Sequence, residues 1–133
     1  MKKWTYKQLV EIGKEIENAT IENVSLNMEN YGCLTLDITL KGNGWGCVFG
    51  GYCLGKGYLG ANDDCFKGYD KGLEAIMRIM DVVGVSDLNK MVGKNVRVAS
   101  EGWGSKVTAI GNILEDKWFD YELFFEKIEK SDC

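Results

Sequence analysis

The sequence predicts an α+β fold in which an antiparallel sheet of about five strands is packed by a central helix, with a further helix at each end. Three observations favour this class. The chain has 133 residues, a length that suits one domain. Stretches with a period of two residues alternate with stretches of helical period. Proline is absent, so the turns depend largely on the 17 glycines. We divide the chain into an accessory helix at 1–18, an α+β core at 19–119, and a C-terminal helix and tail at 120–133.

The first predicted elements are a helix and a hairpin. An amphipathic helix is expected over Thr5–Glu17, because its first residue and Gln8 have the spacing of a capping box and apolar residues follow at helical intervals. Residues 24–28 and 34–40 then alternate between apolar and polar side chains, with a turn at 29–32 between them. This pattern predicts a β-hairpin with one face in solvent.

The middle of the chain predicts a glycine-rich strand and the central helix. The strand is expected over Trp45–Leu54, where the glycines favour a bulge or a close approach of another group. Residues 55–67 are expected to form a loop. The helix should begin near Tyr69 and end before Gly84, a residue suited to a helix C-terminus. The apolar stripe expected to cover the sheet consists of Leu73, Ile76, Met77, Met80 and Val83.

The last third predicts a second hairpin, formed by Asn95–Ala99 and Lys106–Ile110. Residues 112–119 are expected to be irregular. Asp120 should then cap a final helix. The contact positions expected on that helix are Tyr121, Phe124, Phe125 and Ile128.

Composition narrows the function classes. The chain has no histidine, so it lacks the commonest general base and a common metal ligand. No cysteine pair has the C-x-x-C spacing of a zinc or redox site, and we predict no catalytic residue, metal or cofactor. The net charge of −4 without a basic stripe argues against duplex nucleic acid as a partner. No apolar run is long enough for a membrane span, so a cytoplasmic protein is expected.

Aromatic and arginine side chains are the candidates for ligand binding. Trp45, Phe49 and Tyr52 could offer ring faces to a base while the neighbouring glycines let a ribose approach the backbone; equally, they could be core aromatics on a bulged strand. Arg78 and Arg97 could each grip a phosphate with two parallel hydrogen bonds, or be solvated surface cations.

Several sequence blocks occur in an order that is similar to a family of small phage proteins. The blocks are Ile16–Ile21, Tyr31-Gly32, Gly44-Trp45-Gly46, Phe49-Gly50-Gly51-Tyr52, Gly72–Arg78, Val82–Val85, Val96-Arg97-Val98, Ala109–Asn112 and Asp116–Phe119. Between about residues 16 and 119 the chain resembles the first type of Thoeris anti-defence proteins. That family sequesters the cyclic ADP-ribose isomers made by bacterial TIR-domain enzymes. The stretches 5–17 and 55–67 lie mostly outside the resemblance.

The resemblance implies a homo-oligomer, built from dimers in the host cytoplasm, that binds its signal without degrading it. The ligand would be a cyclic ADP-ribose isomer of the glycocyclic type, and cyclic oligonucleotides would be further ligands. The side-chain types suit such a molecule, with the three aromatic residues for adenine, the two arginines for pyrophosphate, and Asn112 for ribose. We expect the site where residues 44–52, the central helix and residues 112–119 meet.

Two rival functions stay open at this point. The first is an inhibitor that binds and occludes a host defence enzyme, as anti-CRISPR proteins do, with its acidic charge imitating nucleic acid. The second is an enzyme that cleaves the signal with carboxylates alone, for which the nearest pairs are Asp63-Asp64 and Glu115-Asp116.

Overall fold

The computed structural model describes residues 4–58, 65–102 and 104–125. Within them lie eight strands, two α-helices, one 3₁₀ helix and a short helical segment at 121–125. In chain order the elements are α1 (Tyr6–Glu11), β1 (Glu15–Asn30), β2 (Cys33–Lys41), β3 (Gly46–Phe49), β4 (Gly55–Tyr58), β5 (Cys65–Gly68), α2 (Asp70–Val83), η1 (Leu88–Met91), β6 (Asn95–Ser100), β7 (Val107–Asn112) and β8 (Trp118–Asp120).

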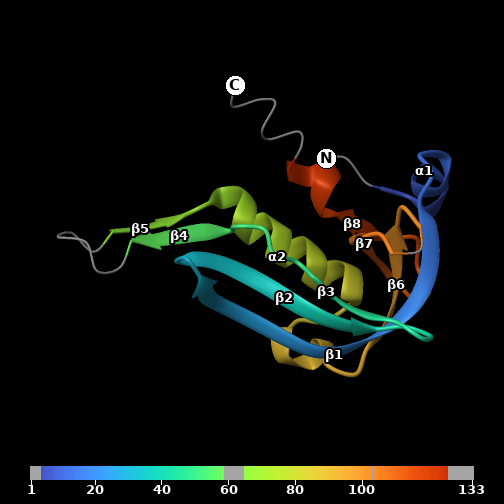
Figure 1. The fold of residues 1–133 in the computed structure, drawn as a ribbon, viewed down its shortest axis with the longest axis horizontal. Coiled ribbons are helices and arrows are strands. Elements are labelled where there is room, and N and C mark those ends of the chain that lie inside the picture. Colours follow the sequence, from blue (N-terminus) through green and yellow to red (C-terminus); the bar gives the residue numbers. More distant parts are fainter. Residues whose placement is uncertain (1–3, 59–64, 103, 126–133) are drawn as a thin grey trace.

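The strands form one strongly curved antiparallel sheet (Figure 1). Its order is β5-β4-β2-β1-β6-β7-β8, and β3 pairs with β2 further along the same edge that β4 uses. Helix α2 contacts β7, β8 and η1, so that it fills the concave side of the sheet. The predicted antiparallel α+β class is therefore confirmed, but the sheet has eight strands rather than about five.

The N-terminal helix is shorter than predicted. The capping box at Thr5 is confirmed, because its hydroxyl accepts from Gln8 N and the Gln8 side chain accepts from Thr5 N. The helix stops at Glu11, since Gly13 takes φ +90°. Residues 15–20 then pair with β6, and this ladder of hydrogen bonds outweighs their helical spacing. The prediction of helix up to Glu17 is wrong for this reason, and strand β1 crosses the boundary that we drew at residue 18.

The glycine-rich strand is interrupted where its glycines cluster. Strand β3 ends at Phe49, because Gly50 and Gly51 have φ of +138° and +83°. A side chain at Gly50 would collide with the carbonyl oxygen of Leu36. The predicted strand up to Leu54 is therefore too long, and the predicted loop at 55–67 instead contains β4 and β5.

Helix α2 has the predicted limits, with Gly84 in the left-handed conformation at its end. Its buried face agrees with the predicted stripe only in part: Val83 is buried, and Ile76 and Met80 pack partly buried against the core. Leu73 and Met77 from the expected stripe are 62% and 69% exposed. The buried positions are Gly72, Ala75, Ile79, Val82 and Val83. The reason is close packing. The Cα atom of Gly72 lies against the backbone of Leu54, so the helix turns its smallest residues inward.

The second hairpin is confirmed as β6 and β7. The region 112–119 is only partly irregular, because strand β8 pairs with residues 109–111 of β7. Asp120 caps the last helical segment as predicted, with its Oδ1 accepting from Leu123 N at 3.0 Å. Tyr121 and Phe124 are buried in the core, whereas Ile128 lies outside the described residues.

A buried polar group adjoins this cap and sets a pH dependence. Lys14 Nζ donates to Thr108 Oγ1 at 3.0 Å, and the Thr108 hydroxyl donates to Asp120 Oδ2 at 3.4 Å. Desolvation raises the pKa of Asp120, against lowering contributions that include the bond from Leu123 N and the charge of Lys14. Because the folded pKa exceeds the unfolded one, ionisation of Asp120 costs folding free energy.

We therefore expect Asp120→Asn, whose Oδ1 can still accept from Leu123 N while its Nδ2 can only donate toward Thr108, to gain stability relative to the native chain as pH rises. The difference in unfolding free energy should grow from about pH 4, where the unfolded carboxyl begins to ionise, up to the raised pKa, and then level off. Denaturant unfolding at several pH values measures it. A difference that shrinks over this window would mean that the pKa of Asp120 is lowered by folding.

Candidate functional site

A hollow of about 370 Å³ lies between the C-terminal half of α2 and the turn that leads into β8. Its volume falls in the range of small-molecule sites. The lining residues are Trp4, Arg78, Asp81, Val82, Asp116, Lys117 and Trp118. We call it the Arg78 hollow.

Asn112 does not line the Arg78 hollow but holds the turn that leads to one of its walls. At the end of β7 its Oδ1 accepts from the backbone N–H groups of Leu114 and Glu115, both at 2.9 Å, which folds the chain into a turn. Its Nδ2 donates to Val82 O at 2.9 Å. The same amide therefore shapes the turn and fastens it to the end of α2.

Arg97 stabilises this turn with two hydrogen bonds from its guanidinium group. Its Nε donates to Asn112 O and its Nη2 to Glu115 O, each at 2.8 Å. Its guanidinium carbon lies 4.9 Å from the centroid of the Trp118 ring. The side chain thus links the carbonyl group of Asn112 to that of Glu115, which also accepts from Lys117 N at 2.9 Å, and it acts as a positioning residue.

Replacing Arg97 by leucine should therefore lower the unfolding free energy by about 1–2 kcal/mol, because two charge-assisted hydrogen bonds at a partly exposed site are lost. Denaturant unfolding measures the loss. Lys94→Ala, at an exposed lysine close by in the chain, is the matched control and should change little. Equal stability of the two variants would show that Arg97 does not hold the turn.

Arg78 projects from α2 at the edge of the hollow, with its side chain 19% exposed. Its Nε donates to Glu74 Oε2 at 2.8 Å, and this bond is the main reason that the pKa of Glu74 is lowered. Its guanidinium carbon lies 6.0 Å from the centroid of the Trp4 ring. Among the described residues, its two terminal nitrogens have no hydrogen-bond partner. Arg78 is thus held at Nε and keeps its outer N–H groups for another acceptor.

Lys117 brings a second cation to the hollow. Its Nζ lies 3.7 Å from Asp81 Oδ1 and 3.9 Å from Glu115 Oε2, at partly exposed side chains. Asp116 Oδ1 accepts from Tyr6 N at 2.7 Å and from Trp118 Nε1 at 3.0 Å. An anionic ligand could therefore replace Asp81 and Glu115 as the partner of the Lys117 ammonium group. The Asp116 carboxylate, in contrast, is occupied by its two hydrogen bonds and keeps the donor residues in place.

The structure divides the six predicted binding residues into two groups. Arg78 lines the hollow, while Arg97 and Asn112 hold its wall. The second group comprises the three aromatic residues. Phe49 is buried in the core, and Tyr52 stacks on Tyr121 with ring centroids 4.5 Å apart. Neither lines the Arg78 hollow, nor does Trp45.

Sequence reasoning did not select five residues of the hollow, namely Trp4, Asp81, Val82, Lys117 and Trp118. Lys117 and Trp118 belong to a block that carried the family resemblance, which was a usable signal. Trp4 gave none. It reaches the hollow through an isolated β-bridge to Trp118, a contact between the two ends of the chain.

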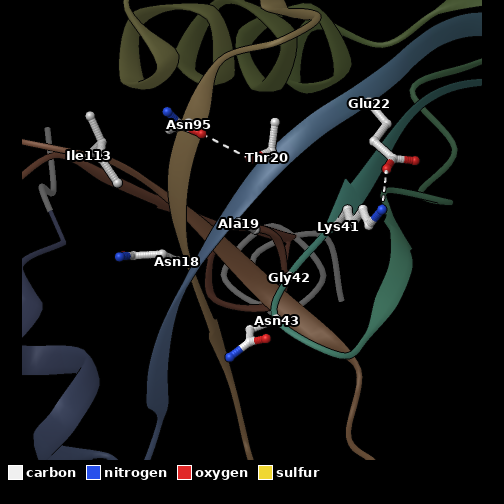
Figure 2. Close-up of a pocket in the computed structure, with 9 residues that line it drawn as sticks. All are labelled: Asn18, Ala19, Thr20, Glu22, Lys41, Gly42, Asn43, Asn95 and Ile113. Atoms are coloured by element: carbon white, nitrogen blue, oxygen red, sulfur yellow. Dashed lines mark hydrogen bonds and ion pairs between the residues drawn. The ribbon is translucent and has the colours of Figure 1, made fainter.

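Three further hollows lie beside the turn between β2 and β3, two of about 540 Å³ and one of about 340 Å³. Figure 2 shows one of the two larger hollows, in which polar side chains surround Ala19 and Gly42. Thr20 Oγ1 donates to Asn95 Oδ1 at 2.9 Å. Its one cation, Lys41, lies 3.8 Å from Glu22 Oε1. This chemistry suits a neutral polar molecule better than a phosphate.

Trp45 lines the smallest of the three, of about 340 Å³, together with Glu17, Cys47, Val107 and several glycines and serines. The indole packs over Gly42, and its buried Nε1 has no hydrogen-bond partner within the described part of the chain. This hollow has a carboxylate and no cation in its lining. The Arg78 hollow suits an anion better than these three hollows, because two cations, Arg78 and Lys117, line it.

Comparisons with protein-family models, curated proteins and solved structures find no match to this chain. Across residues 4–58, 65–102 and 104–125, no helix has the length and apolar character needed to cross a membrane. Over the same ranges, no three cysteine or carboxylate side chains are grouped so that they could hold a metal ion.

Proposed function

We propose that the protein binds a cyclic nucleotide signal of the glycocyclic ADP-ribose type in the Arg78 hollow and sequesters it without degrading it. The observation that carries the proposal is the state of Arg78. Its Nε is fixed by Glu74, and its outer N–H groups border a hollow that also holds Lys117 and two tryptophans. Fixed guanidinium groups are the preferred partners of phosphate.

The chemistry of the hollow assigns each part of such a ligand a partner. The pyrophosphate would lie between Arg78 and Lys117, where two cations meet two phosphates. Trp4 and Trp118 are largely buried and present the apolar wall against which a base would pack. The Asp81 carboxylate can accept hydrogen bonds, and its Oδ1 lies 3.7 Å from Lys117 Nζ, beside the proposed pyrophosphate position. It is therefore the acceptor for ribose hydroxyl groups.

Binding without turnover is supported by the groups that line the hollow. The chain has no histidine to serve as a general base. The Asp116 carboxylate accepts two hydrogen bonds from the walls, and Asp81 pairs with Lys117. Both carboxylates therefore already have partners within the protein.

The biological role follows from the resemblance of the sequence blocks. A phage protein that retains the signal would stop it from reaching the effector of the bacterial defence system. We propose this anti-defence role, and a homo-oligomer built from dimers, on the basis of that resemblance together with the hollow.

Calorimetric titration tests the binding function. Purified protein is titrated with glycocyclic ADP-ribose, with linear ADP-ribose and with a cyclic dinucleotide. We expect saturable binding of the first, and weaker binding of the linear molecule because it has more freedom to lose. Absence of heat with all three would overturn the proposal. A stable complex with a host defence protein in a pull-down would then favour the inhibitor of a defence enzyme.

A further inference from the structure

The hollow shown in Figure 2 has a volume of about 540 Å³ and shares no lining residue with the Arg78 hollow. We call it the Asn95 hollow. Its lining comes from strands β1, β2 and β6, from the turn between β2 and β3, and from the turn between β7 and β8. Segments that are far apart in the sequence therefore bring polar groups to one space. The lining residues with polar side chains are Asn18, Thr20, Glu22, Lys41, Asn43 and Asn95.

The register of the sheet brings these side chains together. Thr20 in β1 lies opposite Lys41 of β2 and also opposite Asn95 of β6. Residues that face each other in neighbouring strands project from the same side of a sheet, and Asn18, two residues before Thr20, projects from that side as well. Groups that stand on paired strands are held more rigidly than groups on a loop, which suits a binding site.

The amide groups in the Asn95 hollow are available to a ligand. Thr20 Oγ1 donates to Asn95 Oδ1 at 2.9 Å, and this bond orients the Asn95 side chain with its Nδ2 away from Thr20 (Figure 2). Within the part of the chain that the structure describes, neither that Nδ2 nor the side-chain amide of Asn18 or Asn43 has a hydrogen-bond partner. Asn27, in contrast, donates to two neighbouring side chains and holds the sheet. The three amides of the hollow thus keep both donors and acceptors for another molecule.

The charges and the side-chain types of the lining define the class of ligand. Its charged side chains are Lys41 and Glu22, which lie 3.8 Å apart and offset each other, so the hollow does not favour an anion. None of its lining residues has an aromatic ring on which a nucleobase could stack. Amide and hydroxyl side chains both donate and accept hydrogen bonds, as the hydroxyl groups of a sugar do. The exposed Ile113 side chain adds an apolar wall for the C–H groups of a sugar ring.

We propose that the Asn95 hollow is a binding site for a neutral saccharide, whose hydroxyl groups bond to the amides of Asn18, Asn43 and Asn95. Asn95 is the main contact, because its orientation is already fixed by Thr20 and little freedom is lost on binding. This site does not depend on the ligand proposed for the Arg78 hollow, so either proposal can fail alone.

Nuclear magnetic resonance titration of the isotope-labelled full chain tests the proposal. The probes are glucose, galactose and maltose as neutral sugars, and glucuronate as the anionic counterpart of glucose. We expect at least one neutral sugar to cause saturable shifts in the amide signals of Asn18, Asn43 and Asn95, with those of Asn27 unchanged. Glucuronate should bind more weakly than glucose. Absence of saturable shifts with all three neutral sugars, or tighter binding of glucuronate, would overturn the proposal.

Single variants test the contacts. Asn95→Ala and Asn43→Ala should each weaken sugar binding about five- to tenfold, the usual effect of losing one neutral hydrogen bond. Asn89→Ala is the matched control, because Asn89 is an exposed asparagine outside the hollow, and its affinity should not change. If Asn95→Ala does not fold, Asn43→Ala gives the result alone, since its side chain makes no hydrogen bond within the described residues. Unchanged affinity in the hollow variants, or an equal loss in Asn89→Ala, would contradict the assignment.

Discussion

Replacing Arg78 by alanine should weaken the binding of glycocyclic ADP-ribose by about 2 kcal/mol, or roughly thirtyfold. The guanidinium is held at Nε by Glu74, so its outer N–H groups are already oriented and little entropy is lost when they bind phosphate. Calorimetric titration of the variant and the native chain measures the change.

Lys71→Ala is the matched control, because Lys71 pairs with the same carboxylate, 3.2 Å from Glu74 Oε1, but does not line the Arg78 hollow. Its affinity should stay close to that of the native chain. Arg78→Lys keeps the charge and loses the planar fork, so it should fall between the two. Unchanged affinity in Arg78→Ala, or an equal loss in Lys71→Ala, would remove Arg78 from the site.

Gly72→Ala should destabilise the fold by about 2–3 kcal/mol, the usual scale for overpacking a core. An alanine inside a helix is ordinarily more stable than a glycine by about 1 kcal/mol. At this position the order should reverse, because an added Cβ would collide with the carbonyl oxygen of Leu54 and press on its Cα atom. Denaturant unfolding measures the effect.

The control for this change is Gly68→Ala, at a glycine where an added Cβ would meet no atom within 4 Å. It should alter the unfolding free energy by less than about 0.5 kcal/mol. A more stable Gly72→Ala variant would show that α2 does not approach Leu54 closely, and that another face of the helix covers the sheet.

The parts of the fold that the sequence predicted well are those with local signals. The hairpins show apolar alternation, and the end of α2 is marked by Gly84, which takes a positive φ. Strands β4 and β5 have no such alternation, because glycine and lysine make up much of both. Only their pairing from Gly55–Gly68 to Tyr58–Cys65 makes them strands.

The orientation of α2 shows a limit of hydrophobic periodicity. Leu73 and Met77 are more hydrophobic than Gly72 and Ala75, so the pattern favoured burying the larger pair. Close packing against Leu54 reversed that preference, because only a face of small residues can approach a backbone so closely. A prediction based on hydrophobicity alone ignores side-chain volume, so it cannot tell that Gly72 rather than Leu73 is buried.

The sequence predicted only part of the candidate site, because side-chain type is visible in a sequence whereas contacts between distant residues are not. Arg78, Arg97 and Asn112 were selected by side-chain type, and all three lie in or beside one hollow. Trp4 could not be selected, because it reaches Trp118 only through pairing between distant parts of the chain.

Recovery of an intact ligand tests the central claim most directly. The protein is incubated with glycocyclic ADP-ribose, passed through a desalting column and heated, and the supernatant is analysed by mass spectrometry. We expect unchanged ligand to be released from the native chain, and much less of it from Arg78→Ala. Release of a cleaved product would show an enzyme, and a supernatant without ligand would contradict sequestration.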